Sequence, residues 1–276
     1  MINKKLKFIS DSFIRHSGIV SVTLKSEMAY RFNFFTSIIW SMLTMALVYF
    51  LWSAIHKSST SITITFQSLV TYVCLGQAFS FGRPGQRHVL MRIGHGIRSG
   101  DVLLDMVRPT DYQMLNFSGS FGSFIMDTLF VSLPSYLLAF FIFHIDPPSS
   151  PAAATGFIIS LLGAFFLVFS LDFLIGIMAF WTRSVWGLSY AKMAIIEILA
   201  GTMVPLSLFP GWLQKVVLVL PFKDMAYTPL AIYVGQIEEN AIIPSILIQF
   251  AWGVGLVLLT RLLWLKARRR LEIQGG

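Results

Sequence analysis

Three acidic residues lie inside long apolar stretches of the chain, where charge is least expected. They are Asp127, Asp172 and Glu197, and the base Lys192 lies near them in the sequence. A charged side chain at the centre of a bilayer costs about 2.5–3.5 kcal/mol on insertion scales, so such residues face a bundle interior, a subunit seam or a water-filled path. In one interpretation the acids line a translocation path that favours cationic or amphipathic substrates. In the other they are structural: Asp172 pairs with Lys192, and the other two are protonated or bonded across helices.

The composition of the whole chain indicates that these residues lie in a membrane. Of the 276 residues, 55% are hydrophobic and 12% are charged, whereas soluble domains carry about 25% charged residues. A transmembrane helix needs roughly 20 apolar residues, and Pro134 is expected to bend one of the predicted helices. Six runs qualify, at about 34–55, 65–81 (shorter and more polar), 115–143, 154–181, 185–209 and 241–265. The sequence therefore predicts an all-α integral membrane protein with six transmembrane helices over residues 33–265.

The distribution of basic residues predicts the orientation. With an even number of spans, 18 of the 21 Lys and Arg residues fall on the side of the two termini, which we therefore place in the cytoplasm. These bases would face anionic lipid headgroups rather than nucleic acid. In the N-terminal segment 1–32, residues 5–30 alternate apolar and basic positions, as an amphipathic helix lying in the cytoplasmic interface would. A disordered basic tail is the alternative there, and residues 266–276 form a basic cytoplasmic tail.

The central cytoplasmic loop, residues 82–112, is predicted to contain a short helix. Ser99 or Asp101 can cap its start, and Pro109 ends it. Asp101 and Asp105 lie one turn apart on one face. The apolar face consists of Val102, Leu103, Met106 and Val107. An exposed amphipathic helix needs a partner protein or a headgroup surface to pack on; a plain surface loop is the alternative.

The outer segment, residues 205–240, is predicted to enter the membrane without crossing it. Pro205, Pro210 and Pro221 each break a helix, and the ten residues between the last two are too few to span a bilayer. A short re-entrant or interfacial helix is expected, with Trp212 at the headgroup level.

Several kinds of chemistry find no support in the sequence. The single cysteine and the scattered histidines have no metal-ligand spacing, and there is no phosphate-binding Gly-x-x-x-x-Gly-Lys-Ser/Thr loop. We therefore expect no enzymatic activity in this chain, and no metal or cofactor bound by it. The small residues of Ser118–Ser123 predict close packing against another helix.

Two of these segments together resemble a known family. The central run is similar to the cytoplasmic loop of one branch of the type-2 ABC transporter permeases, the membrane subunits of many bacterial ABC exporters; it reads Ile97-Arg98-Ser99-Gly100-Asp101, then Leu104 and Arg108-Pro109. The outer run is similar to the family's outer re-entrant hairpin; it reads Pro205-Leu206, Phe209-Pro210, Trp212-Leu213 and Leu220-Pro221-Phe222. The Tyr30-Arg31 pair before the first predicted span also fits the family. The resemblance covers roughly residue 25 to the end.

The resemblance implies a half-transporter in a bacterial inner membrane. A second permease, identical or a sister subunit, would complete it among the membrane lipids, and a separate ABC ATPase would bind ATP and Mg²⁺. The coupling helix and the N-terminal helix would contact this ATPase, and the export substrate would be hydrophobic, amphipathic or cationic. The implied coupling residues are Arg98, Ser99, Gly100, Asp101, Asp105 and Arg108. The rival interpretation is a secondary transporter or channel that needs no ATPase and moves ions or protons through the three acids.

Overall fold

The computed structural model describes residues 2–30, 32–58, 65–79, 88–108, 110–182, 185–202, 204 and 206–270. This part of the chain contains helices and connecting segments and no β-strand, which confirms the predicted all-α class. Pro109 and Pro205 lie outside the described residues, as do parts of the predicted 82–112 loop and of the tail.

Within the described residues, four helical stretches are long and apolar enough to cross a membrane. They are α2 (Phe32–Ser58), the continuous stretch Tyr112–Ile142, the stretch Pro151–Phe180 and α12 (Glu239–Ala267). The second comprises α6 (Tyr112–Asp127), the π-helical turn η2 (Thr128–Ser132) and α7 (Leu133–Ile142); the third comprises α8 (Pro151–Ile177) and η3 (Met178–Phe180). These four stretches match the first, third, fourth and sixth predicted spans.

The helices at the other two predicted spans are shorter than expected. α3 (Phe66–Ala78) has 13 residues and α9 (Trp186–Leu199) has 14, so each rises roughly 20 Å against a hydrocarbon core of about 30 Å. The predicted fifth span, 185–209, is therefore wrong as a single helix. Its helix ends at Leu199, and Gly201 takes the left-handed conformation with φ of 70°. There the Tyr72 hydroxyl donates a hydrogen bond to the Gly201 carbonyl at 2.8 Å.

The bend expected near Pro134 takes the form of a π-helical turn. Proline has no N–H to donate and its ring collides with the carbonyl of the residue four positions earlier, here Phe130. Residues 128–132 accommodate this collision by widening into η2, which ends two residues before the proline.

α8 is the central helix of the bundle, and its small residues admit close neighbours. α4 (His88–Ser99) packs on it near Gly176, where an added Cβ would lie 2.9 Å from the Cβ of Ile93. α12 packs on it near Gly163, where an added Cβ would lie 2.6 Å from Oε1 of Gln249. Phe169 and Phe173 of the same helix are buried in the core.

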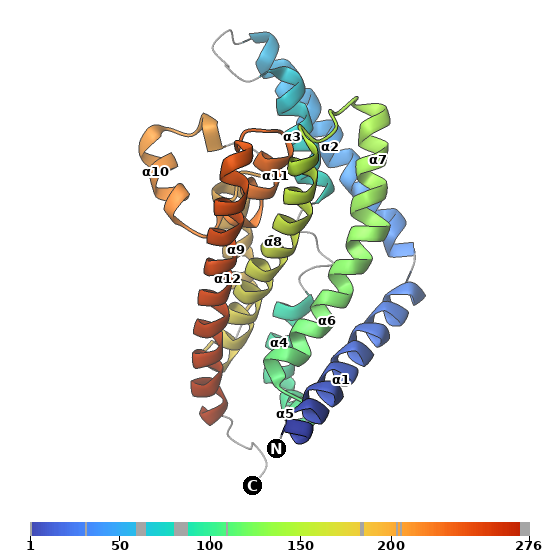
Figure 1. The fold of residues 1–276 in the computed structure, drawn as a ribbon, viewed down its shortest axis with the longest axis vertical. Coiled ribbons are helices and arrows are strands. Elements are labelled where there is room, and N and C mark those ends of the chain that lie inside the picture. The colour runs from blue at the N-terminus through green and yellow to red at the C-terminus, as the bar shows by residue number, and fades with distance from the viewer. Residues whose placement is uncertain are drawn as a thin grey trace.

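The predicted N-terminal helix is present as α1 (Ile2–Ala29), and it packs along α6 (Figure 1). An added Cβ at Gly122 would lie 3.0 Å from the Cβ of Thr23, so the small residues of α6 bring the two helices together. The predicted close packing of Ser118–Ser123 is thereby confirmed. The predicted apolar face of α1 is divided, because Ile14 and Val22 are exposed while Ile19 is half-buried.

Different helices lie at the two ends of the molecule. The start of α1, the end of α12, α4 and α5 (Val102–Val107) lie at one end, and α10 (Gly211–Val219) lies toward the other (Figure 1). The short elements near α10 are η4 (Leu206–Leu208), η5 (Lys223–Met225) and α11 (Tyr227–Tyr233), and η6 (Arg268–Arg270) follows α12. α11 was not predicted, nor was the 12-residue helix α4 within the loop expected at 82–112.

Candidate functional site

The α5 helix presents apolar side chains on the surface at the end of the molecule that holds the termini. Leu104 and Val107 are 68% and 84% exposed, and Leu103 and Met106 are also exposed. Val102 is instead buried and belongs to a core cluster with α4, α6 and α8. The predicted apolar face is therefore divided: one residue anchors the helix and the others are available to a partner.

One ion pair connects α5 to α4, and a second lies within the C-terminal turn of α5. A carboxylate oxygen of Asp105 lies 3.4 Å from Arg92 of α4, and the other oxygen lies 3.3 Å from Arg108. Asp105 therefore acts within this chain, since its carboxylate already faces two guanidinium groups. Asp101 is exposed and accepts a hydrogen bond from the Ser99 hydroxyl at 2.7 Å.

The capping expected of Asp101 is wrong, whereas the Ser99 hydroxyl accepts a hydrogen bond from the Asp101 backbone N–H at 3.4 Å. Asp101 precedes the first turn of α5 but makes no side-chain cap bond, because its carboxylate faces the Ser99 hydroxyl instead. Gly100 connects α4 to α5 with φ of 86°, a conformation that side-chain-bearing residues rarely adopt. Arg98 donates from Nε to the Gly94 carbonyl at 3.2 Å. The six residues implied as coupling residues thus share one corner, formed by the end of α4 and by α5.

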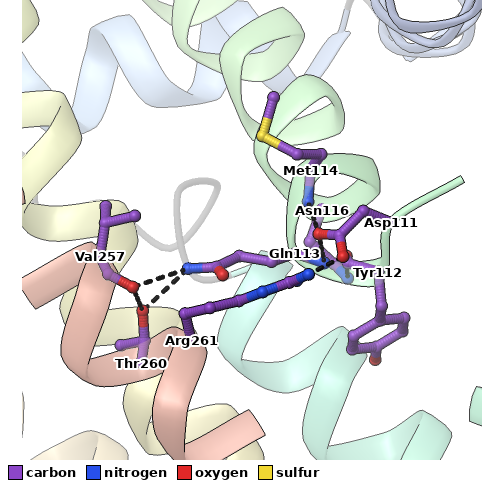
Figure 2. Close-up of polar contacts among 8 residues, drawn as sticks. All are labelled: Asp111, Tyr112, Gln113, Met114, Asn116, Val257, Thr260 and Arg261. Atoms are coloured by element: carbon purple, nitrogen blue, oxygen red, sulfur yellow. Dashed lines mark hydrogen bonds and ion pairs between the residues drawn. The ribbon is translucent and has the colours of Figure 1, made fainter. Parts of the chain in front are cut away.

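The start of α6 is fixed to α12, a connection that the sequence did not suggest (Figure 2). One carboxylate oxygen of Asp111 accepts hydrogen bonds from the backbone N–H groups of Gln113 and Met114, both at 3.1 Å, and so caps α6. The other oxygen pairs with Arg261 of α12. The Gln113 amide also donates to the Thr260 hydroxyl at 2.8 Å. Asp111 lies four positions after the end of α5, so α5 is close in sequence to a point shared by α6 and α12.

Two of the three intramembrane acids are brought to one cavity, and the third is not. Asp127 and Asp172 line a cavity of about 430 Å³ among α1, α2, α4, α6 and α8. Asp172 forms the predicted ion pair with Lys192, with 3% and 8% of the two side chains exposed. Glu197 is exposed on α9 and is not among the residues that line this cavity.

A fourth acid, Glu27, lines the same cavity, although the sequence analysis passed over it. It lies at the end of α1, and its carboxylate accepts a hydrogen bond from the Ser123 hydroxyl of α6. The small residues of α6 could have suggested this contact, since they predict which helix face meets a neighbour. Among the described residues, no group of three or more His, Cys, Asp or Glu side chains could hold a metal ion.

At the opposite end, the proline-bounded segment forms the short helix that was expected. Pro210 immediately precedes α10, which has 9 residues, and Trp212 on it is 70% exposed. The Pro221 carbonyl accepts from the Asp224 N–H at 3.2 Å in the turn leading to η5. α11 then packs on α8, with Leu230 and Ile232 buried.

The fold and these sites define a multi-pass, all-helical membrane protein. A family model described as ABC-2 family transporter protein matches residues 42–275. The chain therefore belongs to this family, that of the type-2 ABC transporter permeases, as its central and outer segments indicated. Membership implies association with an ABC ATPase subunit. No curated protein matches the chain.

Proposed function

We propose that this chain is the permease subunit of an ABC exporter whose ATP is hydrolysed by a separate ATPase. On this proposal the chain is not an enzyme and binds no cofactor; ATP and Mg²⁺ bind to the partner. Family membership supports the ATPase partner, and the sequence contains no phosphate-binding loop of its own. The exported compound is hydrophobic, amphipathic or cationic, which the three acids that line the cavity support.

The observation that carries the coupling proposal is the exposed apolar side of α5. Leu104 and Val107 offer a surface that a partner can bury, while Val102 anchors the same helix in the core. The ion pair between Asp105 and Arg92 connects α5 to α4, so the two helices would move together. A displacement of α5 would then be transmitted along the chain to Asp111, and through its contacts to both α6 and α12.

The membrane arrangement that we propose has six crossings and cytoplasmic termini in a bacterial inner membrane. The start of α1 and the end of α12 lie at one end of the molecule, which supports an even number of crossings (Figure 1). α3 and α9, with their flanking residues, would return the chain between the four long helices. A second permease, identical or a sister subunit, would complete the transporter in the lipid, and the excess of Lys and Arg toward the termini supports this orientation.

The test is recovery of the ATPase from detergent extracts with the tagged full-length chain. Wild-type permease should recover a nucleotide-binding ABC ATPase, and Leu104→Asp or Val107→Asp should reduce that recovery about tenfold by placing a charge in the docking surface. Trp212→Asp is the matched control, since it places the same charge on an exposed apolar residue at the other end. Undiminished recovery by both α5 variants would reject the docking site. ATP-independent solute uptake by the permease alone would favour the ion-coupled alternative.

A further inference from the structure

The cavity described above lies within a single copy of the chain, and α1 forms one of its walls. Thr23, Ser26, Glu27 and Tyr30 of α1 line it, facing residues of α2, α4, α6 and α8. Ser26 and Tyr30 are exposed, as is Asn33 of α2, so the cavity opens beside the connection between α1 and α2. Its volume, about 430 Å³, is within the usual range of roughly 300–1,000 Å³ for sites that hold small organic molecules.

The charged residues of the cavity wall favour a cation. Among the described residues that line it, Glu27, Asp127 and Asp172 are acidic and Arg92 is basic. Arg92 lies 3.4 Å from the Asp105 carboxylate outside the cavity, and Asp172 pairs with Lys192, so the acids of the wall outside these two ion pairs are Glu27 and Asp127. A ligand cation would bring further positive charge to the acidic side of the wall, where partial burial strengthens the attraction.

A buried amide in the same wall supplies an independent indication of a ligand. Asn116 is 1% exposed and lines the cavity, and its Nδ2 donates to the Tyr112 carbonyl at 2.8 Å. Its Oδ1 is buried and has no hydrogen-bond partner in the described part of the chain. A buried acceptor left without a donor is unfavourable by about 1–3 kcal/mol. A ligand that carries N–H groups would remove this penalty, which a quaternary ammonium or phosphonium could not do.

The rest of the wall is aromatic and suits an apolar body. Phe34, Phe124, Phe165 and Phe169 line the cavity. The rings of Phe124 and Phe165 stack with centroids 4.7 Å apart, which leaves a continuous aromatic surface on one side. Aromatic faces attract both apolar groups and cations.

We propose that this cavity binds an amphipathic protonated amine, with its ammonium group near Glu27, Asp127 and Asn116 and its apolar part against the phenylalanines. The proposal rests on the proposed function in taking the bound amine to be an export substrate. It differs from the path first suggested by the sequence, because the site includes Glu27 of α1 and excludes Glu197.

The test is equilibrium binding to the purified full-length permease in phosphatidylcholine nanodiscs, without ATPase or nucleotide. The probe is dansylcadaverine, a fluorescent primary amine, and its N-acetyl derivative is the matched neutral probe with the same aromatic body. Binding to empty nanodiscs is subtracted. Wild-type protein should bind the amine about tenfold more tightly than the acetylated probe. Equal affinity for the two probes would overturn the proposal without any variant being needed.

Variants then locate the site. Glu27→Gln and Asp127→Asn should each weaken amine binding about tenfold and leave the acetylated probe unaffected. Glu197→Gln is the control, since it neutralises an exposed acid away from the cavity, and it should change the affinity by less than about twofold. Equal effects of Glu27→Gln and Glu197→Gln in correctly folded proteins would overturn the proposal. Failure of this binding while the ATPase is still recovered from extracts would reject the amine site and leave the proposed function standing.

Discussion

The buried ion pair between Lys192 and Asp172 gives the sharpest prediction about stability. The pair connects α9 to α8, and 8% and 3% of its two side chains are exposed. Replacement of Lys192 by Met keeps most of the side-chain volume and removes the charge. Asp172 then remains buried without its partner, so Lys192→Met should lower the free energy of unfolding by about 3–5 kcal/mol.

A double variant separates the loss of the pair from the loss of packing. Lys192→Met combined with Asp172→Leu removes both charges, and replacing a buried pair by apolar residues is often neutral or stabilising by about 1–4 kcal/mol. The double variant should therefore recover most of the lost stability. Lys215→Met is the control: this lysine is exposed on α10, and its replacement should change the stability by less than about 0.5 kcal/mol.

The assay is unfolding by titration with SDS in mixed micelles, followed by the loss of circular dichroism. The reasoning is refuted if Lys192→Met is as stable as Lys215→Met. It is also refuted if the double variant is less stable than the single one, because removing the carboxylate that has lost Lys192 should relieve the cost of burying its charge.

Three further variants test the packing and the capping in the same titration. Gly176→Val places a branched side chain where even a Cβ would lie 2.9 Å from the Cβ of Ile93, so a loss of about 1–3 kcal/mol is expected, and wild-type stability would contradict the close packing. Asp111→Ala removes both the cap of α6 and the half-exposed pair with Arg261, for a loss of about 1–2 kcal/mol. Asp111→Asn keeps the cap of α6 and loses the ion pair, so it should lose roughly half as much stability as Asp111→Ala. Equal losses of stability in the two variants would show that the cap and the ion pair do not contribute separately.

The long helices, the short helix between two prolines and one buried ion pair were predictable from the sequence. Apolar length locates α2, α6–α7, α8 and α12, because a bilayer admits few other arrangements of backbone. Pro210 and Pro221 bound α10, since proline cannot continue a helix. The pair between Lys192 and Asp172 was also foreseen, because two opposite charges in apolar surroundings stabilise each other.

The features that were missed depend on which helix faces are neighbours. Hydropathy extended the fifth span to residue 209, whereas the turn at Gly201 depends on a hydrogen bond from distant Tyr72. Nothing in the local sequence shows that Asp111 meets Arg261, which lies 150 positions away. Glu27 was passed over because the basic pattern of the N-terminal segment indicated an interfacial helix, and only the packing of α1 on α6 places this acid at a cavity.

The central claim is that another subunit drives this permease through α5, and photo-crosslinking in native membranes tests it most directly. A benzophenone amino acid replaces Val107 of α5 in one variant and Trp212 of α10 in another, both exposed in the wild type. After irradiation, the adduct from position 107 should contain an ABC ATPase, identified by peptides that carry its phosphate-binding loop, and position 212 should give no such adduct. An ATPase adduct from position 212, or none from position 107, would contradict the account.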